Sequence, residues 1–475
     1  MTTETDVLVI GAGPGGYAAA FRAADLGLKV TLVSEEETLG GVCLLRGCIP
    51  SKTLLQLTEL IHESREAKAK GIDFGKPEVD IKGLREWKNQ VIDTLTKGLD
   101  GLCKTRGVNL VFGRARFRSS SEVDVETGEE NQTLSFGHAI IATGSRPVAI
   151  RGIDFAESRR ILDSTGALEL PEIPKRLLVV GGGYVGLEMG TVYAALGTEV
   201  SLVEMTDRLM GNVDRDLLKP LQKRLEKEFK AIHLNTRVEE LEESDGNVKA
   251  TLEGEESGTQ TYDYVLVAIS RKPNTDDLGL KHTDVELDDD GFIQVDEQRH
   301  TADKAIYAIG DCAGGMLLAH EAMAEGRVAA EVIAGEASAF DARAVPAVVY
   351  TDPQIAWCGL TEQQAEEQGV DVEIAHFPWK ASGRALSMGS EDGLTKLILA
   401  ADTQRILGVG IVGRQAETLI AEGVLAVEMG AVAEDLALSV HPHPTLSETL
   451  GEAAQAFLGG AVHLPGSDSR RKGGK

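Results

Sequence analysis

The chain of 475 residues is poor in cysteine and has no long apolar run. Its five cysteines are too few and too scattered for the disulfide scaffold of a small secreted protein. No apolar run approaches the roughly 20 residues that a transmembrane helix needs. No signal-peptide pattern precedes the first apolar run, Val7–Ile10. These absences predict a soluble protein of the cytoplasm, and the length allows about three domains.

Positive charge is also scarce. The 75 acidic residues outnumber the 48 basic ones and give a formal net charge of −27. This balance argues against non-specific binding to nucleic acid and against docking on an anionic membrane. The acidic residues are spread along the chain. They favour adaptation to a salt-rich cytoplasm, where screening makes so much like charge tolerable, over an ordinary solvated surface.

The chain begins with a pattern of strand, glycine-rich turn, helix and strand. The predicted strand Asp6–Ile10 leads into Gly11-Ala12-Gly13-Pro14-Gly15-Gly16, which precedes a helix over Tyr17–Leu26 and a strand over Lys29–Val33. In such a turn the first glycine forms the bend and the second lets a pyrophosphate approach the backbone. The third glycine allows close packing of helix on strand. Between a strand and a helix, the motif indicates a dinucleotide site.

The same pattern recurs 170 residues later. The predicted strand Leu177–Val180 is followed by Gly181-Gly182-Gly183-Tyr184-Val185-Gly186, a helix over Leu187–Leu196 and a strand over Glu199–Val203. Such a recurrence, in the same strand and helix context, indicates a second dinucleotide site.

The residue after the second strand distinguishes the two sites. Glu204 ends the later unit, and an acid there accepts hydrogen bonds from a ribose 2′-hydroxyl and repels a 2′-phosphate, which predicts NAD over NADP. Arg208, four residues on, weakens that preference. The earlier unit has Ser34 at the equivalent position, so we expect the neighbouring Glu35 to contact the ribose. A solvated loop carboxylate is the alternative for both acids.

Two cysteines stand between the glycine-rich units, in the segment 40–52 (GGVCLLRGCIPSK), before a helix-forming run from Thr53 to Lys70. In a regular helix Cys43 and Cys48 point away from each other, so they can pair only where the backbone is distorted, as the three glycines permit. A thiol at a helix start is also favoured as thiolate. Two unrelated buried cysteines and a zinc half-site are the alternatives, although no second Cys/His pair follows at finger spacing.

Further motifs complete a pattern that covers nearly the whole chain. They are Ala-Thr-Gly at 142–144, Gly-Asp at 310–311 and His-Pro-His-Pro-Thr-Leu-Ser-Glu at 441–448. With the two glycine turns and the cysteine segment, in this order, the chain resembles the pyridine nucleotide–disulfide oxidoreductases. The cysteine and histidine segments are the most specific parts of the resemblance.

The resemblance implies an α/β fold with two Rossmann-like dinucleotide-binding domains, one for FAD and one for NAD, and an α+β C-terminal dimerisation domain. The implied divisions are 1–147 for FAD, 148–272 for NAD, 273–340 for a central domain that completes the FAD site, 341–465 for the interface domain of a homodimer, and 466–475 for a polar, disordered tail.

The implied cofactor ligands follow the same order. For FAD they are Gly11, Gly13, Gly16, Glu35, Lys52, Thr143, Gly144, Arg271, Asp311 and Ala319, and for NAD they are Gly181, Gly183, Gly186 and Glu204. The implied catalytic residues are Cys43, Cys48, His443, Glu448, Lys52 and Glu188, with Lys52 and Glu188 as an ion pair near the flavin, and no metal is expected. Surface charges are the alternative for that pair.

The family pattern places the catalytic base at the second histidine of the late motif, His443, with Glu448 five residues on. Imidazole is suited to deprotonating a thiol near neutral pH, and a carboxylate fixes its tautomer. A structural role is the alternative for His443, as for His441. In the family this segment reaches the cysteines of the other subunit, so a dimer is expected for activity.

The implied reaction is oxidation of dihydrolipoamide to lipoamide with reduction of NAD⁺, through a Cys43–Cys48 disulfide and FAD. The implied protein partner is a second copy of the chain. The implied substrate is either a lipoyl-bearing carrier protein, as in a 2-oxo-acid dehydrogenase complex, or free dihydrolipoamide. Four alternatives remain. A glutathione-type reductase is disfavoured by Glu204, and a mercuric reductase is disfavoured because no vicinal cysteines end the chain. The others are a mainly structural subunit of such a complex and a non-redox FAD-binding module, which would have no use for Cys43, Cys48 and His443 together.

Overall fold

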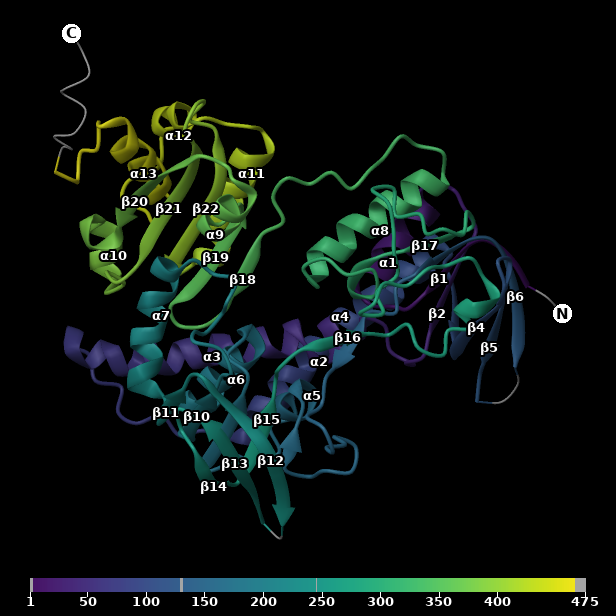
Figure 1. The fold of residues 1–475 in the computed structure, drawn as a ribbon, viewed down its shortest axis with the longest axis horizontal. Helices are drawn as coiled ribbons and strands as arrows, with labels where there is room; N and C mark the ends of the chain where they lie inside the picture. The colour runs from purple at the N-terminus through teal and green to yellow at the C-terminus, as the bar shows by residue number, and fades with distance from the viewer. Residues whose placement is uncertain (1–2, 129–130, 245, 466–475) are drawn as a thin grey trace. The chain divides into compact units, whose positions relative to one another are not determined.

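The computed structural model describes residues 3–128, 131–244 and 246–465 (Figure 1). The predicted tail 466–475 lies outside the described residues. The chain forms two compact units, each made of three segments: the first comprises Met1–Gln56, Glu78–Glu172 and Val267–Asp341, and the second comprises Leu57–Pro77, Ile173–Leu266 and Ala342–Lys475. None of the helices in the described ranges is long and apolar enough to cross a membrane.

The first unit is built on a mixed sheet. Its strands are β1 (Thr3–Ile10), β2 (Val30–Ser34), β3 (Asn109–Phe112), β4 (Arg114–Ser119), β5 (Glu122–Glu126), β6 (Gln132–Ile141) and β17 (Ile306–Ala308). They follow the order β3-β2-β1-β6-β5-β4, and β17 also pairs with β6. The pairings among β3, β2, β1, β6 and β17 are all parallel. Their carboxyl ends therefore meet at one edge, where nucleotides bind in such sheets.

Helices and short elements complete the first unit. They are α1 (Pro14–Asp25), α2 (Gly41–Arg46), α4 (Ile81–Arg106), α5 (Ser164–Leu168), α8 (Ala319–Ile333), the 3₁₀ turns η2 (Leu280–His282) and η3 (Gly310–Cys312), and the strands β7 (Ser145–Pro147), β8 (Ile161–Leu162) and β16 (Arg271–Pro273). Helices α1 and α8 lie side by side (Figure 1). A Cβ atom at Gly326 of α8 would lie 2.6 Å from the Gly15 carbonyl oxygen, so glycine is what allows this close approach. Helix α3 (Cys48–Ala67) begins in this unit and continues, with η1 (Lys68–Lys70), in the second.

The second unit contains another sheet. It consists of β9 (Arg176–Val180), β10 (Glu199–Val203), β11 (Ala231–His233) and β15 (Tyr264–Val267), in the order β11-β10-β9-β15, with helices α6 (Tyr184–Leu196) and α7 (Arg215–Glu228). In this sheet β10 pairs in parallel with β9 and β11. An antiparallel sheet of β12 (Thr236–Ser244), β13 (Asn247–Gly254) and β14 (Gly258–Tyr262) accompanies it. Both predicted strand–turn–helix–strand units, now β1-α1-β2 and β9-α6-β10, are therefore confirmed.

The C-terminal part of the second unit is an antiparallel sheet covered by helices. Its strands, in the order β18-β19-β22-β21-β20, are β18 (Ala347–Val349), β19 (Gln354–Gly359), β20 (Val372–Pro378), β21 (Leu394–Ala400) and β22 (Ile406–Gly413). Its helical elements are α9 (Glu362–Gln368), η4 (Trp379–Ala381), α10 (Gly383–Met388), α11 (Ala416–Glu428), α12 (Ala433–Leu438) and α13 (Glu448–Leu458). Helices α11 and α13 pack on this sheet (Figure 1), and a core of buried side chains from Ala344 to Phe457 lies between them.

Candidate functional site

The first glycine turn has the geometry of a pyrophosphate cradle. Gly11 has φ +108°, and its N–H donates to the Val33 carbonyl oxygen at 2.8 Å. A Cβ atom at Gly16 would lie 1.8 Å from the Gly11 oxygen, so helix α1 can start here only with glycine. At Gly13 a Cβ atom would meet no atom within 4 Å. The backbone at Gly13 is thus open at the positive end of α1, which fits a dinucleotide phosphate.

The two cysteines of the central segment lie on either side of a helix break. Cys43 is in α2 and Cys48 begins α3, and Gly47 separates them with φ −141° and ψ −111°. A Cβ atom at Gly47 would lie 2.7 Å from the Val42 carbonyl oxygen, which explains the glycine. The distortion that the cysteine spacing requires is therefore present.

The two thiols interact directly. The pKa of the Cys43 thiol is raised, first by a hydrogen bond with Cys48 and then by burial. The positive charge of Lys52 acts in the opposite direction and lowers this pKa. Cys43 is half-buried and Cys48 is exposed in the single chain. The contact brings both sulfur atoms within reach of a disulfide exchange.

The redox segment is attached to the first glycine turn. The Gly40 N–H donates to the Ala12 carbonyl oxygen at 3.0 Å. Gly41 has φ +57°, and a Cβ atom there would lie 2.7 Å from the Gly13 Cα atom. Helix α2 therefore starts directly on the open glycine of the cradle, and Cys43 lies two residues farther along.

The expected start of the following helix at Thr53 is wrong. Helix α3 begins at Cys48, so Pro50 is in its first turn, where a missing N–H leaves no intrahelical bond unmade. The first regular bond of the helix runs from the Ser51 N–H to the Gly47 oxygen at 3.0 Å.

The later predicted FAD ligands lie together in the first unit. Arg271 donates from Nε to the Ser145 hydroxyl and from Nη2 to the Ser145 carbonyl oxygen, both at 2.7 Å. Ser145 also donates to Asp311 Oδ2, which lies 3.8 Å from Arg271 Nε. Thr143 donates to the Asn274 carbonyl oxygen at 2.7 Å.

Four sequence-predicted residues are therefore brought to one place by β7, β16 and η3: Thr143, Gly144, Arg271 and Asp311. Ala319 begins helix α8. Ser145, which joins Arg271 to Asp311, is the central side chain of the group.

The two candidates for the first ribose contact differ in exposure. The Ser34 hydroxyl is buried and donates to the Glu36 carbonyl oxygen at 2.9 Å. Glu35 is exposed and forms an ion pair with Arg114 at 3.2 Å. Its contact with FAD stays a prediction.

The second glycine turn repeats the first. Gly181 has φ +108°, and its N–H donates to the Val203 carbonyl oxygen at 2.9 Å. A Cβ atom at Gly186 would lie 2.2 Å from the Gly181 oxygen, whereas one at Gly183 would meet no atom within 4 Å. Gly183 precedes α6 with extended backbone, so its turn also fits a pyrophosphate.

The acid that follows β10 lies at this turn. Glu204 accepts the Gly182 N–H at 2.7 Å through Oε2 and the Thr206 N–H at 2.9 Å through Oε1. Arg208 donates instead to Gln363 Oε1 at 2.8 Å and to the Gly211 carbonyl oxygen. The carboxylate is thus fixed beside the cradle, and the arginine that would favour a 2′-phosphate has its own partners.

The two histidines of the late motif have different environments. His441 is mostly buried, and its Nε2 lies 2.8 Å from Glu422 Oε1 of α11. The His443 side chain is 73% exposed, and its Nδ1 lies 2.8 Å from Glu448 Oε1. His441 is therefore part of the packing, whereas the His443 ring is exposed and uses Nδ1 for its contact with Glu448.

The carboxylate behind His443 is held as an anion. Burial alone raises the pKa of Glu448, but the Thr445 N–H, which donates at 2.7 Å, and the His443 ring together keep this pKa below its usual value. Glu448 also lies in the first turn of α13, where the helix dipole favours negative charge. An anionic partner on Nδ1 stabilises the imidazolium that a general base becomes.

Lys52 and Glu188 fall in different units. Lys52 lies in α3, one turn from Cys48, and Glu188 is buried in α6, where its Oε1 accepts the Tyr350 N–H at 3.0 Å. Their predicted ion pair stays a prediction.

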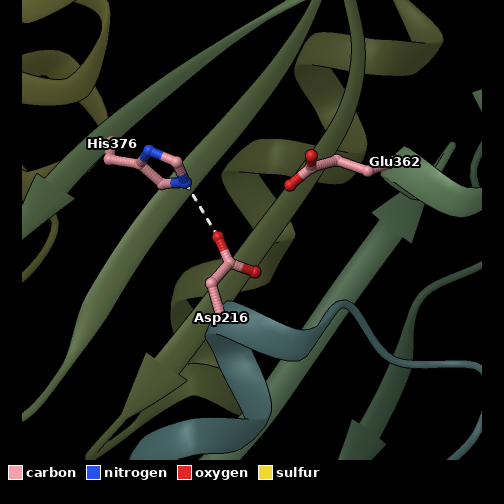
Figure 2. Close-up of side chains that lie close together, drawn as sticks. All are labelled: Asp216, Glu362 and His376. Atoms are coloured by element: carbon pink, nitrogen blue, oxygen red, sulfur yellow. Dashed lines mark hydrogen bonds and ion pairs between the residues drawn. The ribbon is translucent and has the colours of Figure 1, made fainter.

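Another cluster, drawn in Figure 2, has the donor types of a metal site: Asp216, Glu362 and His376. Lys396 is fully buried, and its Nζ atom bonds to both carboxylates of this cluster. It lies 3.0 Å from Asp216 Oδ1 and also donates to Glu362 Oε1. Burial by itself raises the pKa of Asp216, but His376 and Lys396 lower it to about 2. An internal ammonium thus balances the cluster, which joins α7 to β20, β21 and α9.

Comparisons with known proteins agree with this arrangement. Residues 5–326 match the model of the pyridine nucleotide-disulphide oxidoreductases, and residues 345–454 match the dimerisation domain of the same proteins. The chain belongs to this family. It is therefore an oxidoreductase, its two glycine turns fit the FAD and NAD that the family uses, and the second match supports a homodimer.

Relatives of this oxidoreductase cover nearly its whole length. It is 47% identical over 471 residues to the dihydrolipoyl dehydrogenase of Haemophilus influenzae, covering 99% of this chain and 98% of that one. It is 46% identical to dihydrolipoyl dehydrogenase 2 of Haloarcula marismortui, covering 98% of each. Among solved structures, LpdA of Mycobacterium tuberculosis superposes with a TM-score of 0.88 at 26% identity, covering 96% of this chain and 100% of that one.

Sequence reasoning missed some residues beside the predicted site. Tyr17 in α1 is half-buried, and burial, then Cys43 and Cys48, raise its pKa, so its ring lies near the cysteine pair. In the sequence alone, Tyr17 lies three residues before Ala20 in a predicted helix, so it is taken for a residue that packs the helix and not for one beside the cysteines. His463 and Glu452 were also missed, because only the reversal of the chain after α13 brings them together.

Proposed function

We propose that this oxidoreductase converts dihydrolipoamide, carried as a lipoyl group on a protein, to lipoamide and reduces NAD⁺ to NADH. The observation that carries the proposal is the contact of Cys43 with Cys48 across the break at Gly47, on a helix that starts at the first glycine turn. A dithiol substrate requires such a pair, because its oxidation proceeds by exchange with a protein disulfide.

The residues present fit both cofactors. FAD would be held by the turn at Gly11, Gly13 and Gly16 and by the group around Arg271 and Asp311. NAD would be held by the turn at Gly181, Gly183 and Gly186 and by Glu204. When bound, FAD supplies the acceptor that carries two electrons from the reduced cysteines to NAD⁺.

The chain's own residues account for the thiol chemistry. His443 Nε2, in the dimer from the second copy of the chain, takes the proton of one substrate thiol, and Glu448 stabilises the resulting imidazolium. The substrate thiolate attacks the Cys43 sulfur of the Cys43–Cys48 disulfide and releases the Cys48 thiolate. The second substrate thiol then attacks the substrate sulfur bound to Cys43, and its proton passes to the Cys43 sulfur that is released. This closes the lipoyl ring, releases Cys43 and leaves the pair reduced by two electrons.

Charge around the pair supports the assignment of roles. The positive charge of Lys52 lowers the pKa of the Cys43 thiol, against the larger effects of Cys48 and burial. We propose that Lys52 also pairs with Glu188 near the flavin, and that Cys48 is the cysteine closer to it.

The remaining parts of the proposal concern assembly and location. We keep the divisions 1–147, 148–272, 273–340 and 341–465 as functional domains. A lipoyl-bearing carrier, within a 2-oxo-acid dehydrogenase complex, is the proposed partner, and a salt-rich cytoplasm is the proposed setting.

An anaerobic titration tests the function. Dihydrolipoamide is added to the oxidised holoenzyme, the visible flavin spectrum is followed, and NAD⁺ is then added. We expect long-wavelength absorbance of a thiolate beside the flavin, followed by NADH, and Cys43→Ser should lower turnover by at least about 10³-fold. Cys103→Ser, a buried cysteine of the same unit, is the matched control and should keep its activity. An unchanged spectrum with dihydrolipoamide would overturn the proposal and favour another disulfide substrate.

A further inference from the structure

A second histidine–glutamate pair lies one helical turn beyond the catalytic one. His463 Nδ1 lies 2.5 Å from Glu452 Oε1, and Glu452 follows Glu448 by four residues in α13. Residues four apart in a helix are neighbours on the same face. Two imidazole–carboxylate pairs, His443–Glu448 and His463–Glu452, are thus stacked along one helix face.

The C-terminal segment is held in this place by packing and by backbone bonds. Helix α13 ends at Gly459, which has φ +82°, and the Gly460 N–H donates to the Gln455 carbonyl oxygen at 2.8 Å. Leu464, beside His463, packs on the core of the C-terminal sheet. The position of His463 is therefore set by the chain reversal and not only by its ion pair.

Glu452 is an unusual residue to bury beside a catalytic pair. Its side chain is only 13% exposed, and its Oε2 atom is buried without a hydrogen-bond partner among the described residues. A buried carboxylate oxygen that lacks a bond is costly, so its charge must be balanced by a neighbour. His463 is that neighbour, and its ring acts on Glu448 as well, since it is among the charges that lower the pKa of Glu448.

We propose that His463 and Glu452 are positioning residues that set the net charge beside His443–Glu448 and so the pH below which the base loses activity. This rests on the proposed function of His443. A cationic His463 disfavours a second positive charge on His443, and an anionic Glu452 favours it. The two residues therefore act on the base in opposite directions.

Of the other charged groups on the elements packed against α13, Asp435, His376 and Lys396 have partners of their own. His441, which lies beside Gly451 of α13, pairs with Glu422. Helices and strands in contact with α13 are α12, β20 and β21. Their charged residues are Glu434 and Asp435 on α12, Glu373 and His376 on β20, and Lys396 on β21. Asp435 accepts the Val432 N–H, and His376 bonds to Asp216 (Figure 2). Lys396 also bonds to Asp216. Of these groups none is among the main charges acting on Glu448, which are His443 and His463.

The test is the pH profile of kcat/KM for dihydrolipoamide with the holoenzyme dimer. His463→Gln, which keeps a donor for Glu452 but removes the titrating charge, should move the acid limb to higher pH. Glu452→Gln should move it to lower pH. Each shift should be on the order of 0.3 pH unit, which is about a twofold change in kcat/KM on the limb. The double variant His463→Gln/Glu452→Gln should return close to the wild-type profile.

Controls separate charge from structure and from a failure of the proposed function. If the two residues had a purely structural role, the acid limb would shift in the same direction in both single variants. The kcat/KM of the double variant would then be no higher than that of the less active single variant. At about 1 M KCl the shifts should shrink, because exposed charges are screened. His376→Gln, which removes the histidine of a separate histidine–aspartate pair, should leave the profile in place.

Three outcomes would overturn the inference. In the first, the acid limb of the pH profile stays in place in both single variants while His443→Gln loses activity. This result would leave the proposed function intact. The second is a shift of the same sign in both. The third is full activity of His443→Gln, which would remove the assignment of the base and the inference with it. Flavin content and melting temperature equal to wild type establish that each variant is folded.

Discussion

The two glycine-rich segments of the molecule, β1-α1-β2 and β9-α6-β10, share backbone hydrogen bonds at a shift of 170 residues and diverge after their second strands. The Gly11 N–H bonds to Val33 as the Gly181 N–H bonds to Val203. Beyond the second strand, the Gly40 N–H bonds to the Ala12 oxygen, and at the same shift the Met210 N–H bonds to the Gly182 oxygen, at 3.0 and 3.1 Å.

The two segments differ in the residue at the end of the second strand and in the path of the chain beyond that shared bond. In the first unit Gly41 lies against Gly13 and starts the helix that carries Cys43. In the second, the chain passes through Met210 at φ +46° toward α7, and Glu204, at the position of Ser34, binds the Gly182 N–H. One scaffold thus forms both glycine turns, and the chain after the second strand decides whether the turn is joined to the cysteine pair or to an acid, Glu204, for which we propose a ribose contact.

The largest effect should come from substitutions at the glycine that both segments need at the start of their helix. Gly16→Ala and Gly186→Ala each place a Cβ atom against a backbone oxygen, at 1.8 and 2.2 Å, so both should lower the free energy of unfolding by about 3 kcal/mol. Urea midpoints measure this, with Gly98→Ala in α4 as the control, because a Cβ atom there would meet no atom within 4 Å and Gly98 lies in neither proposed cofactor site. Wild-type midpoints for both helix-start variants would show that the close approach is not essential.

A smaller effect should separate the two cradles by ligand. Gly13→Ala fills the space proposed for the FAD pyrophosphate and should lower flavin content at purification. Gly183→Ala should keep its flavin and raise the KM for NAD⁺ about tenfold, roughly 1.4 kcal/mol of binding. Absorbance at the flavin maximum and steady-state kinetics give the two values. Loss of flavin in Gly183→Ala would mean that the assignment of the two sites is reversed.

The smallest effect should concern the acids. Glu204→Gln should raise the KM for NAD⁺ by about fivefold and reduce discrimination against NADPH, because a fixed anion is lost beside the ribose. Glu35→Gln should weaken FAD binding by only about twofold, since Glu35 is exposed and paired with Arg114. Glu37→Gln, an exposed acid two residues away, is the control. Equal FAD binding by the Glu35 and Glu37 variants would contradict the ribose contact.

The sequence by itself determined the features that depend on local geometry. Glycine spacing alone specifies both turns, since a Cβ atom at Gly16 or Gly186 cannot be accommodated. The four residues between Cys43 and Cys48 require a break in the helix, and Gly47 provides it. Helix α3 begins five residues before Thr53, because a proline in a first turn leaves no intrahelical bond unmade and Cys48 can therefore start the helix.

Only the tertiary structure decided which charged side chains face each other. His441 and His443 are alike in sequence, yet packing against α11 buries the first and leaves the second exposed. Lys396 reads as a surface lysine in a strand, and the fold buries it among three carboxylates. His463 reaches Glu452 because the chain reverses at Gly459. Steric limits act between neighbours in sequence, whereas the partners of a charge are chosen by how distant segments pack.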